Sequence, residues 1–137
     1  MAKMPQVVME KLADMEAAKF MATVDADGTP NVAAILSVMP FGEEKLVFVD
    51  LMMNKTRKNL LDNGKVAISV LTKDAISYQV KGTFEGFQTS GPLFEMYATH
   101  PLLKYNAYSG PRAVGLIQVD SVFTACPPLP GKEIKKD

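Results

Sequence analysis

Six short apolar segments, separated by clusters of turn-forming residues, constrain the fold of this chain more than any other feature. Their composition and alternation predict strands, which cover Lys19–Val24, Asn31–Met39, Lys45–Leu51, Lys65–Leu71, Ile76–Gln88 and Ala113–Ala125. The turn cluster Asp25–Pro30 separates the first two, so these strands are expected to pair as a hairpin. A parallel sheet needs a crossover helix after nearly every strand, and this chain has too few helices for that arrangement. The pattern therefore predicts a small antiparallel barrel with flanking helices.

Helices are predicted at three places around these strands. They cover Pro5–Ala18, Thr56–Asp62 and a segment from Ser90 to about His100. The first has apolar residues at helical spacing, Gly64 suits the stop of the second, and Pro92 suits the first turn of the third. Residues Leu102–Pro111 are expected to be irregular or to form a short helix, and residues 127–137 to form a tail. The length fits one domain, residues 1–137.

The segment Met53–Leu60 carries three cations, a hydroxyl and two amides where the third predicted strand runs into the second helix. The first turn of a helix has unpaired N–H groups and a partial positive charge, so it suits an anion. Such turns usually contain Asp or Glu, and a cationic turn is explained if a bound phosphate supplies the negative charge. The alternative is a solvated basic helix start. The spacing Gly-x-x-x-x-Gly-Lys is absent, so this is not a Walker A loop.

Charge and composition argue against several classes of function. Lys and Arg number 15, and Asp and Glu also number 15, whereas nucleic-acid binders normally carry a basic excess. No signal peptide and no apolar stretch long enough to span a bilayer are visible, so no membrane partner is expected. Cys126 is the single cysteine, which allows no internal disulfide and fits a reducing cytoplasm. His100 is the single histidine, so a multi-His metal site is excluded and no metal is expected.

The order of four short motifs resembles that of a known family. Asp-Gly-x-Pro lies in the first hairpin turn, Asn-Lys-Thr-Arg-Lys-Asn-Leu follows the third strand, and Val-Ala-Ile-Ser-Val and Tyr-Gln-Val-Lys-Gly lie in the fourth and fifth strands. From about Lys11 to Thr124 the chain is similar to the flavin-binding split β-barrel superfamily, which includes pyridoxamine 5′-phosphate oxidase and small FMN-binding proteins. The resemblance implies an α+β, mainly β fold: a six-stranded antiparallel split β-barrel with flanking helices. It also implies a homodimer with the FMN site at its interface.

The resemblance implies a site for the FMN phosphate after the third strand, at Lys55 and Thr56 with Arg57 or Lys58 in support. It places the flavin ring against the second strand and the end of the third, and a Gln of the fifth strand near the ring or ribityl chain. The implied FMN-binding residues are Asn31, Ala33, Ala34, Ile35, Leu36, Val49, Asp50, Asn54, Lys55, Thr56, Lys58, Gln79 and Lys81. Lys81 could stabilise negative charge on a reduced flavin. Alternatively, Gln79 and Lys81 form the solvent face of an amphipathic strand.

Several other residues admit two interpretations. Asn31 and Ser37 could reach the ring edge or could be ordinary polar hairpin residues. Met39, Met52 and Met53 could pack on the ring or fill the core. His100 could transfer a proton or only complement a helix dipole, and Cys126 is interpreted as a buried or semi-exposed thiol. No catalytic residue can be assigned.

Two departures from the family pattern bear on activity. Pyridoxamine 5′-phosphate oxidases carry basic residues in the second strand and Arg and His in a C-terminal segment. Here Asn31–Met39 has no charge, and the tail after Cys126 has neither Arg nor His. We therefore predict an FMN-dependent oxidoreductase that is not itself a pyridoxamine oxidase. The alternatives are a non-catalytic flavin carrier or electron-transfer module, or a barrel that binds haem or a deazaflavin. Haem would need an axial ligand such as His100, Cys126, a Met or a Tyr.

Overall fold

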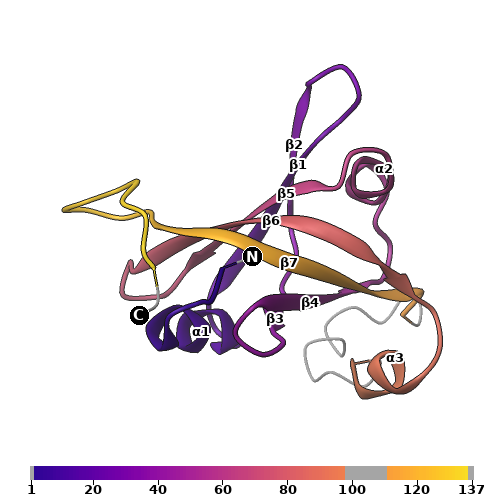
Figure 1. Cartoon of the computed structure of the whole chain (residues 1–137), viewed down its shortest axis with the longest axis horizontal. Helices are drawn as coiled ribbons and strands as arrows, with labels where there is room; N and C mark the ends of the chain where they lie inside the picture. Colours follow the sequence, from indigo (N-terminus) through magenta and orange to yellow (C-terminus); the bar gives the residue numbers. More distant parts are fainter. Residues whose placement is uncertain (1, 98–110, 136–137) are drawn as a thin grey trace.

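An antiparallel sheet of seven strands forms the body of the structure, a computed structural model that describes residues 2–97 and 111–135 (Figure 1). The strands are β1 (Ala18–Val24), β2 (Pro30–Ala34), β3 (Met39–Pro40), β4 (Lys45–Asp50), β5 (Lys65–Leu71), β6 (Ser77–Gln88) and β7 (Ala113–Thr124). The helices are α1 (Gln6–Ala13), α2 (Lys55–Asp62) and α3 (Pro92–Tyr97). Neighbouring strands follow the order β2-β1-β5-β6-β7-β4-β3, and every pair is antiparallel. The predicted fold class is confirmed.

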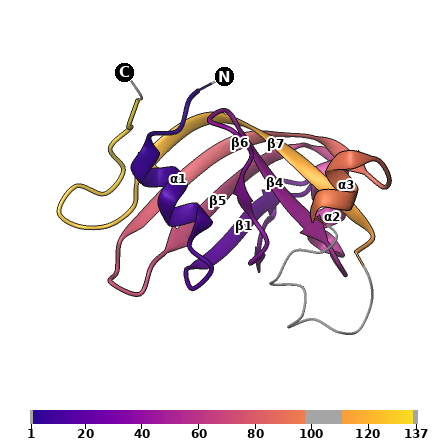
Figure 2. The same cartoon turned by 90° about the horizontal axis from the view of Figure 1, so that it is seen from below.

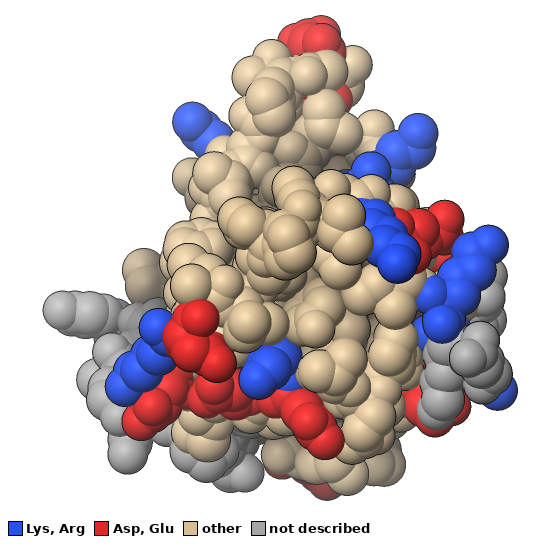
Figure 3. Space-filling model, turned by 90° about the vertical axis from the view of Figure 1, so that its left-hand side faces the viewer, with Lys and Arg blue, Asp and Glu red and all other residues tan. Residues whose placement is uncertain are grey.

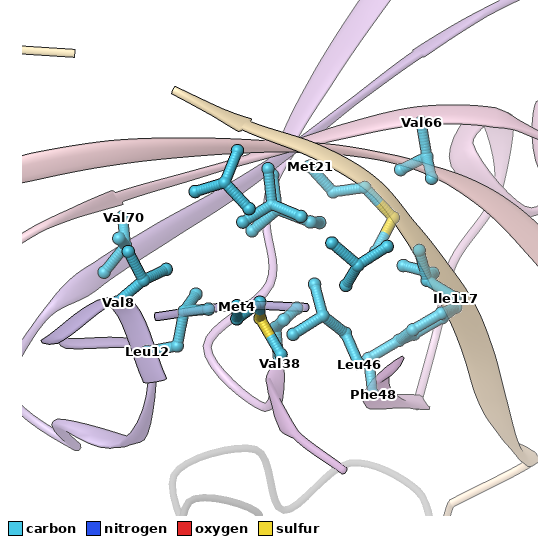
Figure 4. Packing of buried hydrophobic residues seen from close by; sticks show 14 of the residues in the cluster. Met4, Val8, Leu12, Met21, Val38, Leu46, Phe48, Val66, Val70 and Ile117 are labelled. Carbon is cyan, nitrogen blue, oxygen red and sulfur yellow. The ribbon is translucent and has the colours of Figure 1, made fainter. Parts of the chain in front are cut away.

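The core lies on the concave side of this curved sheet, where alternate residues of each strand meet (Figures 2 and 4). On β5, for example, Val66, Ile68 and Val70 point inward, because strand side chains alternate between faces. Helix α1 packs its buried Val8 and Leu12 into the same cluster. Such burial contributes about 1.5–3 kcal/mol for each large apolar side chain. The core therefore fixes which face of every strand is available to a ligand or a partner.

The prediction of one continuous second strand over Asn31–Met39, and so of six strands, is wrong. The strand β2 ends at Ala34, and β3 lies at the opposite edge of the sheet. Between them the Ile35 N–H donates to the Lys19 carbonyl (3.0 Å), and the Ser37 hydroxyl accepts from the Val49 N–H (2.9 Å). These bonds replace ladder pairing, so the chain crosses from one edge to the other. Within the described residues the sheet is consequently open between β2 and β3.

Lys19 of β1 supports this crossing from inside the sheet. Its side chain is 1% exposed, and its Nζ donates to the carbonyls of Leu36 (3.3 Å) and Val38 (2.9 Å). Burial lowers the pKa of Lys19 to about 8, although the carboxylate of Asp14 acts in the opposite direction. A neutral amine has two N–H donors, which matches the two carbonyl acceptors. The link Ile35–Val38 therefore depends on a lysine that is expensive to keep charged.

We expect the free energy of unfolding to rise with pH between about pH 8 and 10.5 through Lys19. The pKa of this lysine is about 8 when folded and 10.5 when unfolded, so in this window the unfolded chain binds more protons. Below the window both states are protonated, and the folded state bears the full cost of a buried charge. Urea unfolding of wild type and Lys19→Met should show a stability difference that shifts in favour of wild type by about 2–3 kcal/mol across the window. A difference independent of pH would contradict the assignment.

Other predicted boundaries mostly agree with the observed elements. One exception is α1, which ends at Ala13 rather than Ala18, because the Asp14 carboxylate accepts a hydrogen bond from the Glu16 N–H (2.9 Å) and begins a turn. The positive φ of Gly64 (80°) confirms the predicted stop of α2. His100, residues 102–110 of the predicted segment Leu102–Pro111, and the last two residues of the tail lie outside the described residues. In the part of the chain that is described, no helix has the length and apolar character needed to cross a membrane.

Candidate functional site

A pocket of about 600 Å³ lies between the free edge formed by β2 and its crossing link, the end of β4 and the start of α2. Its volume is in the range of small-molecule and cofactor sites. The lining residues are Asn31, Val32, Ala33, Ala34, Ile35, Leu36, Ser37, Val49, Leu51, Met52, Met53, Asn54, Lys55 and Thr56. They come from two segments that are distant in the sequence, and nine of them are among the predicted FMN-binding residues.

The start of α2 gives one end of the pocket its polar character. Asn54 stands at the cap position, yet its side chain does not cap the helix, and the first turn contains no acidic residue. The N–H groups of that turn and their partial positive charge therefore face a region that suits an anion. Lys55 is exposed at the same place and is the one titratable side chain among the described residues that line the pocket.

Thr56 is held at this end in a defined orientation. Its side chain is 4% exposed, and its hydroxyl oxygen accepts a hydrogen bond from the Asn31 side-chain amide on β2 (3.2 Å). A second bond, from the Asn59 amide to the Thr23 hydroxyl (3.0 Å), fixes α2 against β1. Because the Thr56 oxygen is already an acceptor, its O–H proton is available as a donor to a ligand. In residues 2–97 and 111–135 no acceptor for that proton is observed.

The two other cations of the predicted phosphate site are engaged elsewhere. Arg57 donates to the fully buried carboxylate of Asp50 (2.5 Å) and lies over the ring of Phe87 (4.4 Å). Lys58 is 74% exposed and pairs with Asp62 (2.6 Å), whose hydrogen bond raises the pKa of Lys58. Neither Lys58 nor Asp50, both among the predicted FMN-binding residues, lines the pocket. Of the predicted phosphate-binding residues, Lys55 and Thr56 therefore remain at the pocket, together with the start of α2.

The rest of the pocket is mainly apolar. Ile35, Leu36 and Val49 form one part of its wall, and Leu51, Met52 and Met53 form another. Ser37 also lines it, but its hydroxyl is bound to the Val49 backbone, so its polar atom is already used. A mainly apolar wall with a cation at one end suits an amphipathic ligand that carries one anionic terminus. Val32 and Leu51 were missed by the sequence analysis, although the first lies within the predicted ring-binding strand and the second beside the basic turn.

Gln79 and Lys81 lie on the outer face of the sheet, away from the core. Inward-facing Tyr78, Val80 and Gly82 alternate with them along β6, as predicted. Lys81 lies over the Phe123 ring (4.9 Å) and borders a shallower hollow of about 400 Å³ on the outer face. Within one chain, β1 and β5 lie between these two residues and the β2 edge that lines the pocket, and neither residue lines it.

The candidate haem ligands are not assembled at this pocket. His100 lies outside the described residues, and Cys126, which is half-buried and free, borders a separate hollow near the tail. No His, Cys or Tyr is among the described residues that line the main pocket; Met52 and Met53 are the sulfur-bearing residues there. Among the described residues, no group of three or more His, Cys, Asp or Glu side chains is arranged to hold a metal ion.

Comparison with known proteins supports the same fold over nearly the whole chain. A curated relative, the uncharacterised protein MJ0282 of Methanocaldococcus jannaschii, is 34% identical over 121 residues, which cover 86% of this chain and 80% of that protein. The crystal structure of HupZ from Group A Streptococcus superposes with a TM-score of 0.78 at 27% identity, covering 96% of this chain and 99% of that one. An FMN-binding protein of Syntrophomonas wolfei gives 0.73 at 16% identity, over 90% and 92% of the two chains.

A family model gives the most direct assignment. The model described as pyridoxamine 5′-phosphate oxidase matches residues 8–126, which include every strand of the sheet and the pocket described above. The resemblance inferred from the four sequence motifs is thereby confirmed. This chain belongs to the pyridoxamine 5′-phosphate oxidase-like family of flavin-binding split barrels.

Proposed function

We propose that this protein binds FMN in the pocket between β2 and α2 and acts as a flavin-dependent oxidoreductase. The observation that carries the proposal is the start of α2: an uncapped first turn, exposed Lys55 and the donor hydroxyl of Thr56, at one end of a mainly apolar pocket. Lys55 and Thr56 would hold the phosphate, since a cation and a hydroxyl donor both bind phosphate oxygens. Ile35, Leu36 and Val49 would contact the flavin ring.

Bound FMN would supply hydride or electron transfer, and the chain would supply binding, orientation and electrostatics. The described lining residues include no Asp, Glu, His, Cys or Tyr, so Lys55, assigned to the phosphate, is the one titratable side chain that this part of the chain places at the pocket. That observation favours a second candidate, an electron-transfer or carrier module that binds FMN in the same way. The oxidoreductase would convert a small-molecule substrate at the flavin, whereas the electron-transfer or carrier module would not.

We further propose a homodimer with the site at its interface. Phe20, Val32, Leu36 and Leu71 are 39–66% exposed. Strand pairing places Phe20 on the same face as Ala34 and Ser69. In the view of Figure 3, Lys, Arg, Asp and Glu are sparse at the centre of the surface. An exposed apolar area of this kind is typical of protein interfaces. In such a dimer Gln79 and Lys81, which are on the outer face, would serve the pocket of the partner rather than their own.

Pyridoxamine 5′-phosphate oxidation is not part of this proposal. The second substrate of such an enzyme carries its own phosphate, which needs further cations next to the flavin. Lys55 is the only Lys or Arg among the described lining residues, and it is assigned to FMN. The absence of charge from the β2 segment, noted in the sequence, agrees with this assignment.

We expect the purified protein to bind about one FMN per chain, with a dissociation constant in the micromolar range or below. Equilibrium dialysis against FMN, with the folded state checked by circular dichroism, measures both quantities. If the folded protein bound no FMN at tens of micromolar, a concentration that corresponds to a binding free energy of roughly −6 kcal/mol, the proposal would be refuted. Haem and a deazaflavin in parallel dialysis provide the comparison with the alternative ligands.

A further inference from the structure

Asp50, at the end of β4, is the most completely engaged charged group in the described structure. Its carboxylate is 0% exposed and accepts three hydrogen bonds: from Arg57 (2.5 Å), from Arg112 (2.9 Å) and from the Met53 N–H (2.9 Å). A buried carboxylate is tolerated only when it is paired and hydrogen-bonded in this way. We call Asp50, Arg57 and Arg112, together with the Met53 backbone, the Asp50 clamp.

The clamp joins three segments that meet at the pocket. Arg57 belongs to α2, Arg112 precedes β7, and Met53 lies in the turn between β4 and α2. Arg112 binds this turn at two further points: its side chain donates to the Met53 carbonyl (2.6 Å), and its backbone N–H donates to the Asp50 carbonyl (2.8 Å). The N–H and the carbonyl of Met53 are therefore both fixed by the clamp.

The turn fixed in this way forms part of the candidate ligand site. Every residue from Leu51 to Thr56 lines the pocket, whereas Asp50 and Arg57, which bracket this run, do not. Lys55 and the first N–H groups of α2 thus lie on a short segment held at both ends by the same carboxylate. A displacement of about 1 Å in such a segment is enough to weaken charge-assisted hydrogen bonds.

We propose that Asp50 is a positioning residue, which through Arg57 and Arg112 holds the Leu51–Thr56 turn in the geometry that binds the ligand phosphate. This inference rests on the proposed FMN function for the identity of the ligand, but the ordering of the turn does not depend on it. The clamp also explains why Arg57 does not serve the phosphate itself: its guanidinium is committed to Asp50 and to the face of Phe87.

The test uses Arg112→Gln and Asp50→Asn, with Asp62→Asn as the matched control. Arg112 is 47% exposed, and Met53 is the one pocket residue among its observed hydrogen-bond partners in the described residues, so Arg112→Gln should fold. It should weaken FMN roughly three- to tenfold and riboflavin, which lacks the phosphate, less than about twofold. Asp50→Asn should produce the same selectivity with a larger loss. Asp62→Asn breaks only the exposed pair with Lys58 and should leave both affinities unchanged.

Amide hydrogen exchange of the ligand-free protein supplies a readout that needs no FMN. Arg112→Gln should speed exchange at Met53–Arg57 while the central strands β5 and β6 stay protected. Unchanged exchange in this turn, or equal losses for FMN and riboflavin, would overturn the proposal even if Asp50→Asn failed to fold. If wild type bound no FMN, the proposed function would fail, and the exchange result alone would then support or overturn the clamp.

Discussion

Gly115→Ala is expected to lower the free energy of unfolding by about 2–3 kcal/mol, through overpacking of the core. Gly115 on β7 is paired with Phe48 on β4. A Cβ at this position would collide with the Phe48 ring, reaching its Cε1 at 2.5 Å and its Cζ more closely still. The ring cannot easily retreat, because Phe48 is fully buried and packs against Phe84 and Phe87 at centroid distances of 6.2 and 6.0 Å.

Urea unfolding of four proteins tests this explanation: wild type, Gly115→Ala, Phe48→Leu and the double variant. If the collision with the ring is the cause, Gly115→Ala should be less harmful by about 1 kcal/mol or more in the Phe48→Leu background. Strict additivity of the two single effects would show that the glycine is needed for another reason. The slope of unfolding free energy against urea should be unchanged, since the fold is expected to remain the same.

Lys55→Ala is expected to weaken FMN binding about ten- to a hundredfold, and riboflavin binding far less. Removing one partner of a buried charge pair costs about 2–5 kcal/mol. Removing one partner of an exposed pair costs under about 1 kcal/mol. A phosphate at the exposed Lys55 lies between these limits, at roughly 1.5–3 kcal/mol. Thr56→Val should cost about 1 kcal/mol, the contribution of one hydrogen bond.

Titration of each variant with FMN and with riboflavin measures the effect of the phosphate directly. Lys58→Ala is the matched control, since Lys58 is on the same helix but pairs with Asp62 outside the pocket. It should leave both affinities near those of wild type. Equal losses of the two ligands in Lys55→Ala would place the phosphate elsewhere and would remove this lysine from the site.

The parts of the fold that could be predicted are those encoded by local patterns. The alternation along β6 correctly assigned its inward and outward residues, and the basic turn singled out in the sequence lies at the polar end of the pocket. The break after Ala34 could not be predicted, because residues 31–39 contain no Gly, Pro or charge and read as one apolar run. What interrupts it is Lys19, whose side chain binds the carbonyls of Leu36 and Val38 from a neighbouring strand.

The candidate site was predicted less completely, for a similar reason. The family resemblance placed the flavin ring against the end of the third strand, so Asp50 was predicted to contact the ligand. Its burial depends on Arg112, which is 62 residues away in the chain and carries no local signal. Likewise, alternation placed Gln79 and Lys81 on one face of β6 but could not tell that β5 and β1 would lie between β6 and the strand that lines the pocket. Both outcomes depend on contacts between residues that are far apart in the chain, and a single sequence does not reveal such contacts.

The interruption between β2 and β3 also explains where the pocket can exist at all. A barrel with continuous hydrogen bonding around its circumference would fill its interior with side chains and leave no lateral opening. Here the two edge strands, β2 and β3, follow each other in the sequence, and the pocket lies beside β2 and the link that joins them. Because β2 and β3 do not pair with each other, space for a ligand is left beside β2. Stability and binding are consequently in competition between β2 and β3. A change that let these strands pair would strengthen the fold, but it would close the space proposed for the cofactor.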